Sequence, residues 1–63
     1  MIFFLFTEFD GSYGRRREVV GFTTAEARDA YGAQQRPYGD ESWSDYETWE
    51  APHSEWPHVR IVG

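Results

Sequence analysis

The sequence predicts an α+β fold, in which one helix packs on one face of an antiparallel sheet of three or four strands, in the order β-β-α-β-β. Three observations predict it: a short, apolar and β-rich first segment, a glycine-containing turn that leads to a second such segment, and a helix-capping pattern directly after it. The chain has 63 residues. That length suits one core, so we expect a single domain over residues 1–63.

The first predicted strand, residues 2–9, carries apolar side chains on both of its faces. Ile2, Phe4 and Phe6 share one face, and Phe3, Leu5 and Phe9 share the other. This pattern predicts a central strand that is covered on both sides, or one whose second face meets a partner. Residues 10–14 have turn chemistry with two glycines, and residues 18–22 form the second predicted strand, so the two strands form a β-hairpin.

The predicted helix spans about residues 24–34 and begins with a capping box, with Thr23 as the N-cap and Glu26 at N3. Gly32 follows its last turn, or the helix runs to residue 35, and Pro37 ends it in either case. Its sheet-facing side, from the helical spacing, consists of Ala27, Ala30, Tyr31 and Gln34.

We expect Tyr31 and Ala27 to lie above the first strand, over one of its two apolar faces. The residues beneath them are either Phe4 and Phe6 or, alternatively, Phe3 and Leu5. If Ala30 also faces the sheet, its replacement by a large residue overpacks this contact and costs about 1–3 kcal/mol.

The C-terminal third of the chain predicts two more strands. Residues 34–41 form a polar loop, and residues 42–50 form a third strand rich in aromatic residues. A connection with two prolines, residues 51–57, cannot join a central ladder. Residues 58–62 form the last strand, with Val59 and Ile61 on one face.

Composition and charge exclude several classes of protein. The chain has no cysteine, a formal net charge of −5 and a pI near 4.7. The lack of cysteine excludes disulfides and thiolate metal sites and fits a reducing compartment. The acidic balance disfavours phosphate binding, so we do not expect nucleic acid as a partner. The apolar run at residues 2–6 is too short for a signal peptide or membrane helix, so we expect a soluble, cytoplasmic protein with no membrane partner.

The third strand and the connection after it combine acidic and aromatic residues. Six carboxylates and no basic residue lie between residues 40 and 55. Tryptophan and tyrosine are favoured anchors in interfaces, so this stretch predicts a surface for a basic protein partner. The alternative is a half-buried strand with its aromatic side chains inside and its carboxylates in solvent. Three tryptophans are more than so small a core is expected to bury, which counts toward the first interpretation and leaves the half-buried strand open. The candidate partner-binding residues are Trp43, Asp45, Tyr46, Glu47, Trp49, Glu50 and Trp56.

Two other groups of polar residues have a structural interpretation beside the functional one. The arginines at 15–17 could contact phosphate or an acidic partner, but such a run is more often solvated or paired with local acids such as Glu8. His53 and His58, with glutamates nearby, have a spacing that matches no helical ligand pair, so we expect no metal site.

The sequence offers little for catalysis. It has no cysteine nucleophile and no lysine, and it contains no G-x-S-x-G, P-loop or G-x-G-x-x-G pattern. Paired carboxylates are expected by chance in an acidic strand, and so short a chain can hardly enclose a pocket that shifts their pKa values. We therefore expect no enzyme and no cofactor.

The chain resembles a class of short bacterial and phage proteins of unknown function. The resemblance rests on the strand at residues 3–6, the segment 18–22 and the helix start Thr23-Thr24-x-Glu26-Ala27. Proteins of that class continue with a strand reading roughly E-V-V-G-V-F, open a helix with Thr/Ser-x-x-Glu-Ala, and end with a tyrosine- and acid-rich strand. The similarity covers about residues 2–50. It implies the β-β-α-β(β) layout and a small accessory protein encoded by a phage, and it implies no catalytic residues.

These observations give a leading functional hypothesis and two alternatives. The leading one is a non-enzymatic accessory protein that binds a host or self protein, as an inhibitor of a defence or regulatory factor. The alternatives are a nucleic-acid mimic that blocks a DNA- or RNA-binding protein, and a small structural or direct nucleic-acid-binding protein. One helix covers only one sheet face, so we also expect a homodimer through the other face, unless the residues around 43–56 fold back over it.

Overall fold

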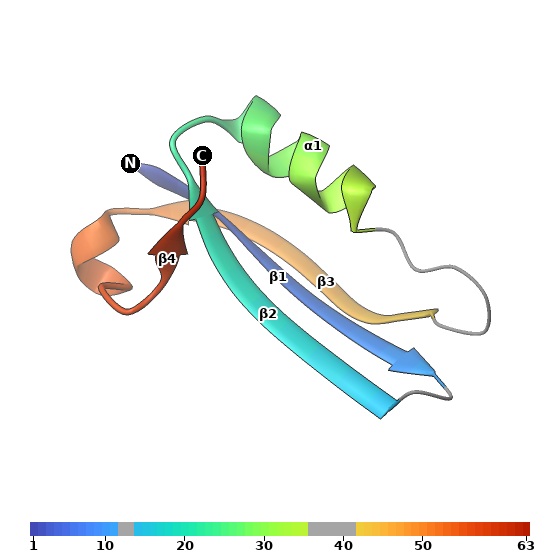
Figure 1. Cartoon of the computed structure of the whole chain (residues 1–63). Coiled ribbons are helices and arrows are strands. Elements are labelled where there is room, and N and C mark those ends of the chain that lie inside the picture. Colours follow the sequence, from blue (N-terminus) through green and yellow to red (C-terminus); the bar gives the residue numbers. More distant parts are fainter. Residues whose placement is uncertain (12–13, 36–41) are drawn as a thin grey trace.

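The computed structural model describes residues 1–11, 14–35 and 42–63. Its elements, in chain order, are β1 (Ile2–Gly11), β2 (Gly14–Phe22), α1 (Ala25–Gln34), β3 (Ser42–Ala51), the short 3₁₀ turn η1 (His53–Glu55) and β4 (Arg60–Ile61) (Figure 1). The predicted α+β class, with one helix and a sheet, is confirmed. No helix in the described ranges is long and apolar enough to cross a membrane.

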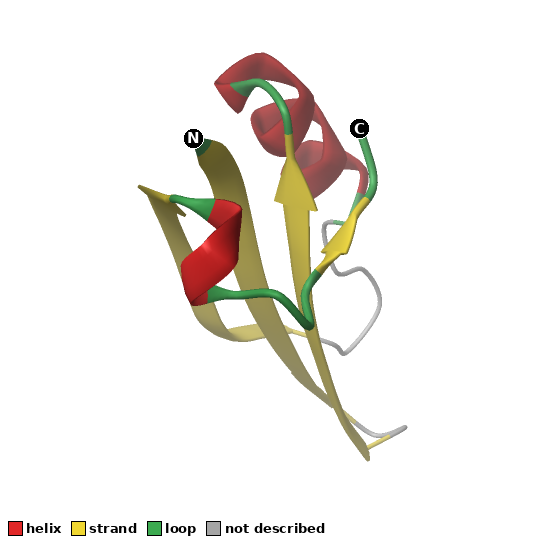
Figure 2. Ribbon diagram, turned by 90° about the vertical axis from the view of Figure 1, so that its left-hand side faces the viewer, coloured by secondary structure: helices red, strands yellow, loops and turns green. Residues whose placement is uncertain are grey.

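The sheet has four strands in the order β3-β1-β2-β4. β1 pairs antiparallel with β2 and β3, whereas β4 pairs parallel with β2. The prediction of a purely antiparallel sheet is therefore wrong, and the strands do not lie in the order in which the chain forms them. The reason is the connection after β3: it crosses one face of the sheet instead of turning back beside β3, and it delivers β4 to the far edge (Figure 2).

β1 is an inner strand between β3 and β2, and α1 covers one of its faces, which we call the helix face. Leu5, Val20 and Phe22 are buried there, and Ala27 and Tyr31 of α1 pack against them. The rings of Phe22 and Tyr31 lie 5.2 Å apart. Of the two predicted arrangements, the one with Phe3 and Leu5 beneath the helix is the one observed, because these side chains alternate onto the helix face.

The opposite face of β1, which we call the tail face, is covered by the C-terminal part of the chain. Phe4 is 0% exposed there; its ring stacks on Trp49 at 5.3 Å and contacts Trp56 at 6.1 Å. Ile61 of β4 also reaches this face, at Gly21. Figure 2 shows α1 and η1 on opposite sides of the sheet. Residues 2–6 are apolar on both faces because both faces are covered.

The helix begins one residue later than the capping pattern predicts. Thr24 is the N-cap, and its hydroxyl accepts a hydrogen bond from the Ala27 amide at 3.1 Å. Gly32 lies inside the helix and is buried, so the prediction that it ends the helix is wrong and the alternative, in which the helix runs on, is closer.

The sheet-facing side of α1 is also rotated from the predicted one. Ala30 and Gln34 are exposed, whereas Arg28, Tyr31 and Gly32 face the sheet or its edge. The Arg28 guanidinium lies over the Phe3 ring, 5.8 Å from its centroid.

The hairpin strands are longer than predicted. β2 begins at Gly14, which has a φ of 99°, a conformation that glycine adopts without strain. The three arginines at 15–17, which lie between the predicted turn and the second predicted strand, are therefore part of β2. The predicted turn residues 12 and 13, and the loop residues 36–41 with Pro37, lie outside the described residues.

Candidate functional site: the edge strand β3

β3 is an edge strand that carries most of the predicted partner-binding residues. It is ten residues long and pairs with β1; in the described part of the chain no strand pairs with its other side. Successive side chains of a strand point to opposite faces, so the acidic and aromatic residues of β3 are divided between the two faces of the sheet. We call Trp43, Asp45, Tyr46, Glu47, Trp49, Glu50 and Trp56 together the acidic-aromatic edge.

The register with β1 decides which residues lie on which face. Asp45, Glu47 and Trp49 pair with Glu8, Phe6 and Phe4, so they lie on the tail face, where Trp56 joins them from the turn after η1. Trp43, Tyr46 and Glu50 pair with Phe9, Thr7 and Phe3, on the helix face. The prediction of a single acidic and aromatic surface is thus replaced by two half-surfaces that meet along one strand.

The tail-face half is built around two tryptophans. The rings of Trp49 and Trp56 lie 5.4 Å apart, and with Glu47 and Thr48 they line a hollow of about 480 Å³. Trp56 is 43% exposed, although it helps to bury Phe4. The indole N–H of Trp49 is buried and has no hydrogen-bond acceptor among the described residues. Such a donor costs about 1–3 kcal/mol, so the position of Trp49 depends on its ring contacts.

The helix-face half lies between β3 and α1. The rings of Trp43 and Tyr46 meet edge to face at 4.9 Å, and Phe9 lies 4.6 Å from Trp43. A second hollow, of about 440 Å³, is lined by these two residues of β3 and by Asp29, Gly32 and Ala33 of α1. A Cβ at position 32 would lie 2.7 Å from the Tyr46 hydroxyl oxygen, so glycine lets this side chain lie against the helix.

The helix residues of the second hollow were not predicted from the sequence. The signal that could have identified them is Gly32, a glycine within the helix that is better explained by the close approach of another side chain than by helix propensity. Asp29 adds a carboxylate beside Trp43 and Tyr46, and it already accepts a bond from Arg28 at 3.0 Å.

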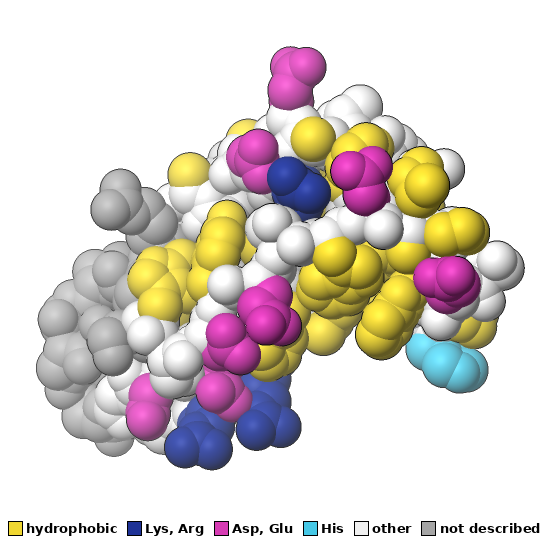
Figure 3. All heavy atoms as spheres, turned by 180° about the vertical axis from the view of Figure 1, so that it is seen from behind, with side chains coloured by type: hydrophobic (Ala, Val, Ile, Leu, Met, Phe, Trp, Pro, Cys, Tyr) yellow, Lys and Arg dark blue, Asp and Glu magenta, His cyan; other side chains and the backbone are white. Residues whose placement is uncertain are grey.

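The carboxylates of β3 differ from those on the neighbouring strands in their partners. Asp45, Glu47 and Glu50 are exposed, and no arginine or histidine of the described ranges forms an ion pair with them. Glu8 and Glu18, in contrast, pair with Arg17 and Arg60. The negative charge of β3 is therefore left to solvent along the open edge. Acidic side chains lie among groups of exposed hydrophobic ones in the space-filling view (Figure 3).

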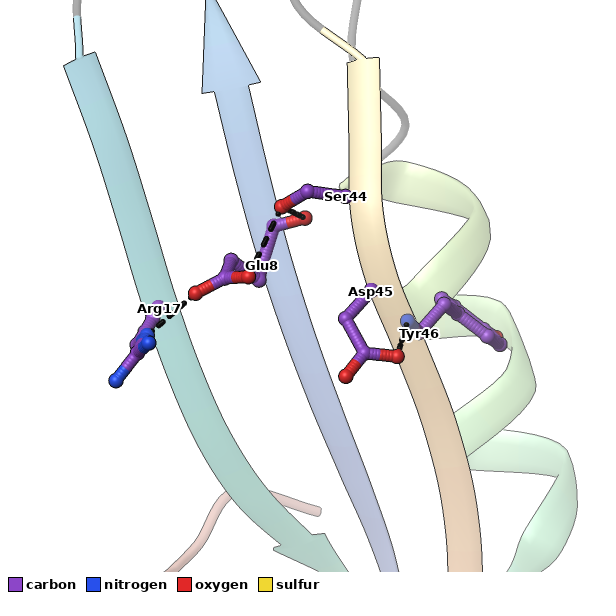
Figure 4. Close-up of polar contacts among 5 residues, drawn as sticks. All are labelled: Glu8, Arg17, Ser44, Asp45 and Tyr46. Carbon is purple, nitrogen blue, oxygen red and sulfur yellow. Dashed lines mark hydrogen bonds and ion pairs between the residues drawn. The ribbon is translucent and has the colours of Figure 1, made fainter.

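Next to this edge, Glu8 ties three strands together on the tail face (Figure 4). Its carboxylate accepts a hydrogen bond from Arg17 of β2, and the Ser44 hydroxyl of β3 lies 3.1 Å from it. The bond from Arg17 is the main reason that the pKa of Glu8 is lowered from its ordinary value. Ser44 is the extra residue of a bulge in β3, opposite the step from Glu8 to Phe9.

The arginine run thus makes local contacts, as its structural interpretation predicts. Arg17 pairs with Glu8, and the Arg16 guanidinium lies over the Phe9 ring, 4.6 Å from its centroid. Arg15 lies opposite Asp10 in the hairpin. His53 and His58 are exposed, and within residues 1–11, 14–35 and 42–63 no three histidine, aspartate or glutamate residues group as metal ligands.

No family model, no curated protein and no solved structure matches this chain.

Proposed function

We propose that this chain is a non-enzymatic accessory protein that binds another protein through its acidic-aromatic edge. The observation that carries the proposal is the combination, on β3 and the adjacent Trp56, of a strand edge with no partner strand among the described residues, exposed carboxylates and exposed aromatic rings. Tyr46 is 44% exposed and Trp56 is 43% exposed. Partly buried aromatic side chains held by their neighbours lose little entropy on binding and supply large contact areas.

The charges support a protein partner with a basic surface. Exposed carboxylates without a cationic neighbour steer an oppositely charged partner and suppress acidic ones. In a chain with a net charge of −5, the β3 carboxylates would repel a phosphate backbone. The two hollows beside β3 are open to solvent, which suits side-chain docking better than the enclosure of a small substrate.

The placement of the carboxylates favours this proposal over a nucleic-acid mimic. A mimic needs two spaced rows of negative charge, as in a duplex. The described carboxylates of β3 are divided between the two faces, and Arg17 lies on the same face as Asp45 and Glu47.

The test is a pair of matched variants in a binding experiment. The double variant Asp45→Asn/Glu47→Gln removes two charges from the edge, and the control Asp10→Asn/Glu26→Gln removes two from outside it, so each has a net charge of −3 instead of −5. Partners are captured from a lysate of the source organism and identified by mass spectrometry, and the affinity of a purified candidate is then measured by calorimetry.

The proposal predicts a defined partner that the wild type and the control bind alike and that the edge variant binds more weakly. The difference should shrink as salt is added, since exposed charges are screened over about 8–10 Å at physiological ionic strength. Equal loss of partner binding in both double variants would mean that binding depends on net charge alone. Equal retention of binding in both would place the binding surface elsewhere. Either outcome overturns the proposal.

A further inference from the structure

We infer that the open edge of β3 binds an extended, basic segment of the partner as a fifth strand of the sheet. The inference rests on the proposed function and specifies how the partner docks. It commits to one occupant: a strand with lysine or arginine at every second position.

The backbone of β3 is available for pairing on its outer side. The Tyr46 amide donates a hydrogen bond to the Asp45 carboxylate at 2.8 Å, so it points away from β1 (Figure 4). In an antiparallel ladder the N–H and C=O of alternate residues point the same way, which places those of Thr48 and Glu50 on the same open side. A ten-residue edge strand is longer than most proteins leave uncovered, because such an edge accepts further strands.

The charge of β3 selects which strand can be added. A residue of an added strand that lies opposite Asp45 or Glu47 shares the tail face with it, at the distance of a cross-strand pair. A basic side chain is favoured at both positions. A second copy of β3 would instead place its own acidic strand against these carboxylates, and like charges directly opposite each other destabilise the pair. The carboxylates therefore prevent self-addition while they attract a basic strand.

The two hollows fit the alternation of such a strand. On the tail face, a basic residue opposite Trp49 would reach the hollow of Trp49, Trp56 and Glu47, where two indole rings and a carboxylate suit a cation. On the helix face, the residue opposite Tyr46 would point toward the hollow beside Gly32 and Ala33, which suits an apolar side chain. The edge thus fits basic residues opposite positions 45, 47 and 49, and an apolar one opposite position 46.

The experiment uses the whole chain and four synthetic peptides of eight residues. The first alternates arginine and valine. The second has the same composition with its four arginines consecutive. The third and the fourth have the sequence of the first but carry N-methyl groups on backbone amides. In the third, the methylated amides are those that point to one edge of the strand, and in the fourth, those that point to the other edge. Binding is measured by calorimetry, and hydrogen exchange of the backbone amides is followed by NMR.

The alternating peptide should bind about tenfold more tightly than the consecutive one, a difference expected from a few correctly placed cross-strand pairs. It should slow amide exchange at Tyr46, Thr48 and Glu50, and one of the two N-methylated versions should lose binding. Glu47→Gln should weaken the binding of the alternating peptide by up to about fivefold, the effect of one cross-strand ion pair, whereas Glu26→Gln should leave its affinity unchanged.

Equal affinity for the alternating and consecutive peptides, or full binding by both N-methylated versions, would show attraction by charge without strand addition and overturn the inference. So would a wild-type mass of twice 7.4 kDa with the β3 amides already protected, which would make a second copy the occupant. None of these results decides the proposed function, which fails if Asp45→Asn/Glu47→Gln and its matched control lose or retain a protein partner equally.

Discussion

Gly21 is the residue at which the tail face depends most directly on a missing side chain. A Cβ there would lie 2.8 Å from the Ile61 Cδ1, 2.9 Å from the Ile2 Cγ2 and 3.2 Å from the Phe4 ring. Gly32 lies in an equally close contact, but the atom in contact is the hydroxyl at the end of the exposed Tyr46 side chain, which can move. The two glycines therefore have different tolerances to the same substitution.

We predict that Gly21→Ala lowers the free energy of unfolding by about 1–3 kcal/mol, because overpacking forces Ile2, Phe4 and Ile61 apart. Gly32→Ala, the matched control, should be neutral or should stabilise the protein by up to about 1 kcal/mol, since alanine is the better helix former. Urea denaturation of both variants measures the difference. A Gly21→Ala protein as stable as the wild type would mean that β4 does not pack where the structure places it.

Glu8 makes the stability depend on acid pH. Because its pKa is lowered in the folded state, mainly by the bond from Arg17, the unfolded chain binds the proton more readily. The contribution of this carboxylate is present above its ordinary pKa of 4.5 and is lost as the pH falls through the lowered value. Glu8→Gln should therefore be less sensitive to acid than the wild type over this window. Thermal melts between pH 6 and about pH 2 measure it, and a parallel acid dependence in both proteins would contradict the role of Glu8.

At the scale of elements, the helix shows what a pattern of residue types can predict. The capping pattern locates the start of α1 to within one residue, because capping is local chemistry: the predicted N-cap is Thr23 and the observed N-cap is Thr24. Of the four residues predicted to face the sheet, Ala27 and Tyr31 pack against it, whereas Ala30 and Gln34 are exposed. The sheet-facing side of α1 also includes Arg28, which lies over Phe3, and Gly32, which lies against Tyr46. A search for large apolar side chains at helical spacing selects neither residue. Tyr31 was placed correctly, and its hydroxyl also donates to Glu18 of β2 at 2.8 Å.

The rotation of α1 leads to a prediction for Ala30. Because Ala30 is exposed, Ala30→Phe should change the free energy of unfolding by less than about 0.5 kcal/mol, the usual range for surface substitutions. Tyr31→Ala, one position further, should cost several times more, since Tyr31 packs against Phe22. Chemical denaturation distinguishes them, and a loss of 1–3 kcal/mol in Ala30→Phe would restore the helix face expected from the sequence.

The sheet shows the corresponding limit for strands. The alternation of residues 2–9 predicts a strand covered on both faces, and β1 is central because a strand with two apolar faces cannot lie in solvent. The parallel β4 could not be predicted in this way, because a two-residue strand has no period and its direction depends on the path of residues 52–59. The acidic-aromatic edge was identified by composition, but its division between two faces depends on the register of β3 with β1.

For the whole molecule, the cover of the tail face decides how much apolar surface is left for other molecules. The homodimer expected from the sequence assumes that this face is open. Phe4 is fully buried there, which corresponds to the alternative in which the C-terminal residues fold back over the face. Phe6 is half-buried and Val19 is 37% exposed, so part of the face is still available to a second copy. The apolar area that the tail face exposes is therefore small while Trp56 covers Phe4, and it would be large without the Trp56 side chain.

We predict that Trp56→Ala increases self-association, because the removal of its indole exposes Phe4 and Trp49 together and creates a larger apolar patch. The matched control is Tyr46→Ala: Tyr46 is 44% exposed, like Trp56, but it lies on the helix face and covers neither residue. Light scattering over a range of concentrations should give a higher average mass for Trp56→Ala than for the wild type and for Tyr46→Ala. If Trp56→Ala keeps a mass near 7.4 kDa at all concentrations, the exposed rings do not form an interface. If instead the wild type already has twice that mass, Phe6 and Val19 suffice for the homodimer, and the cover provided by Trp56 does not control association.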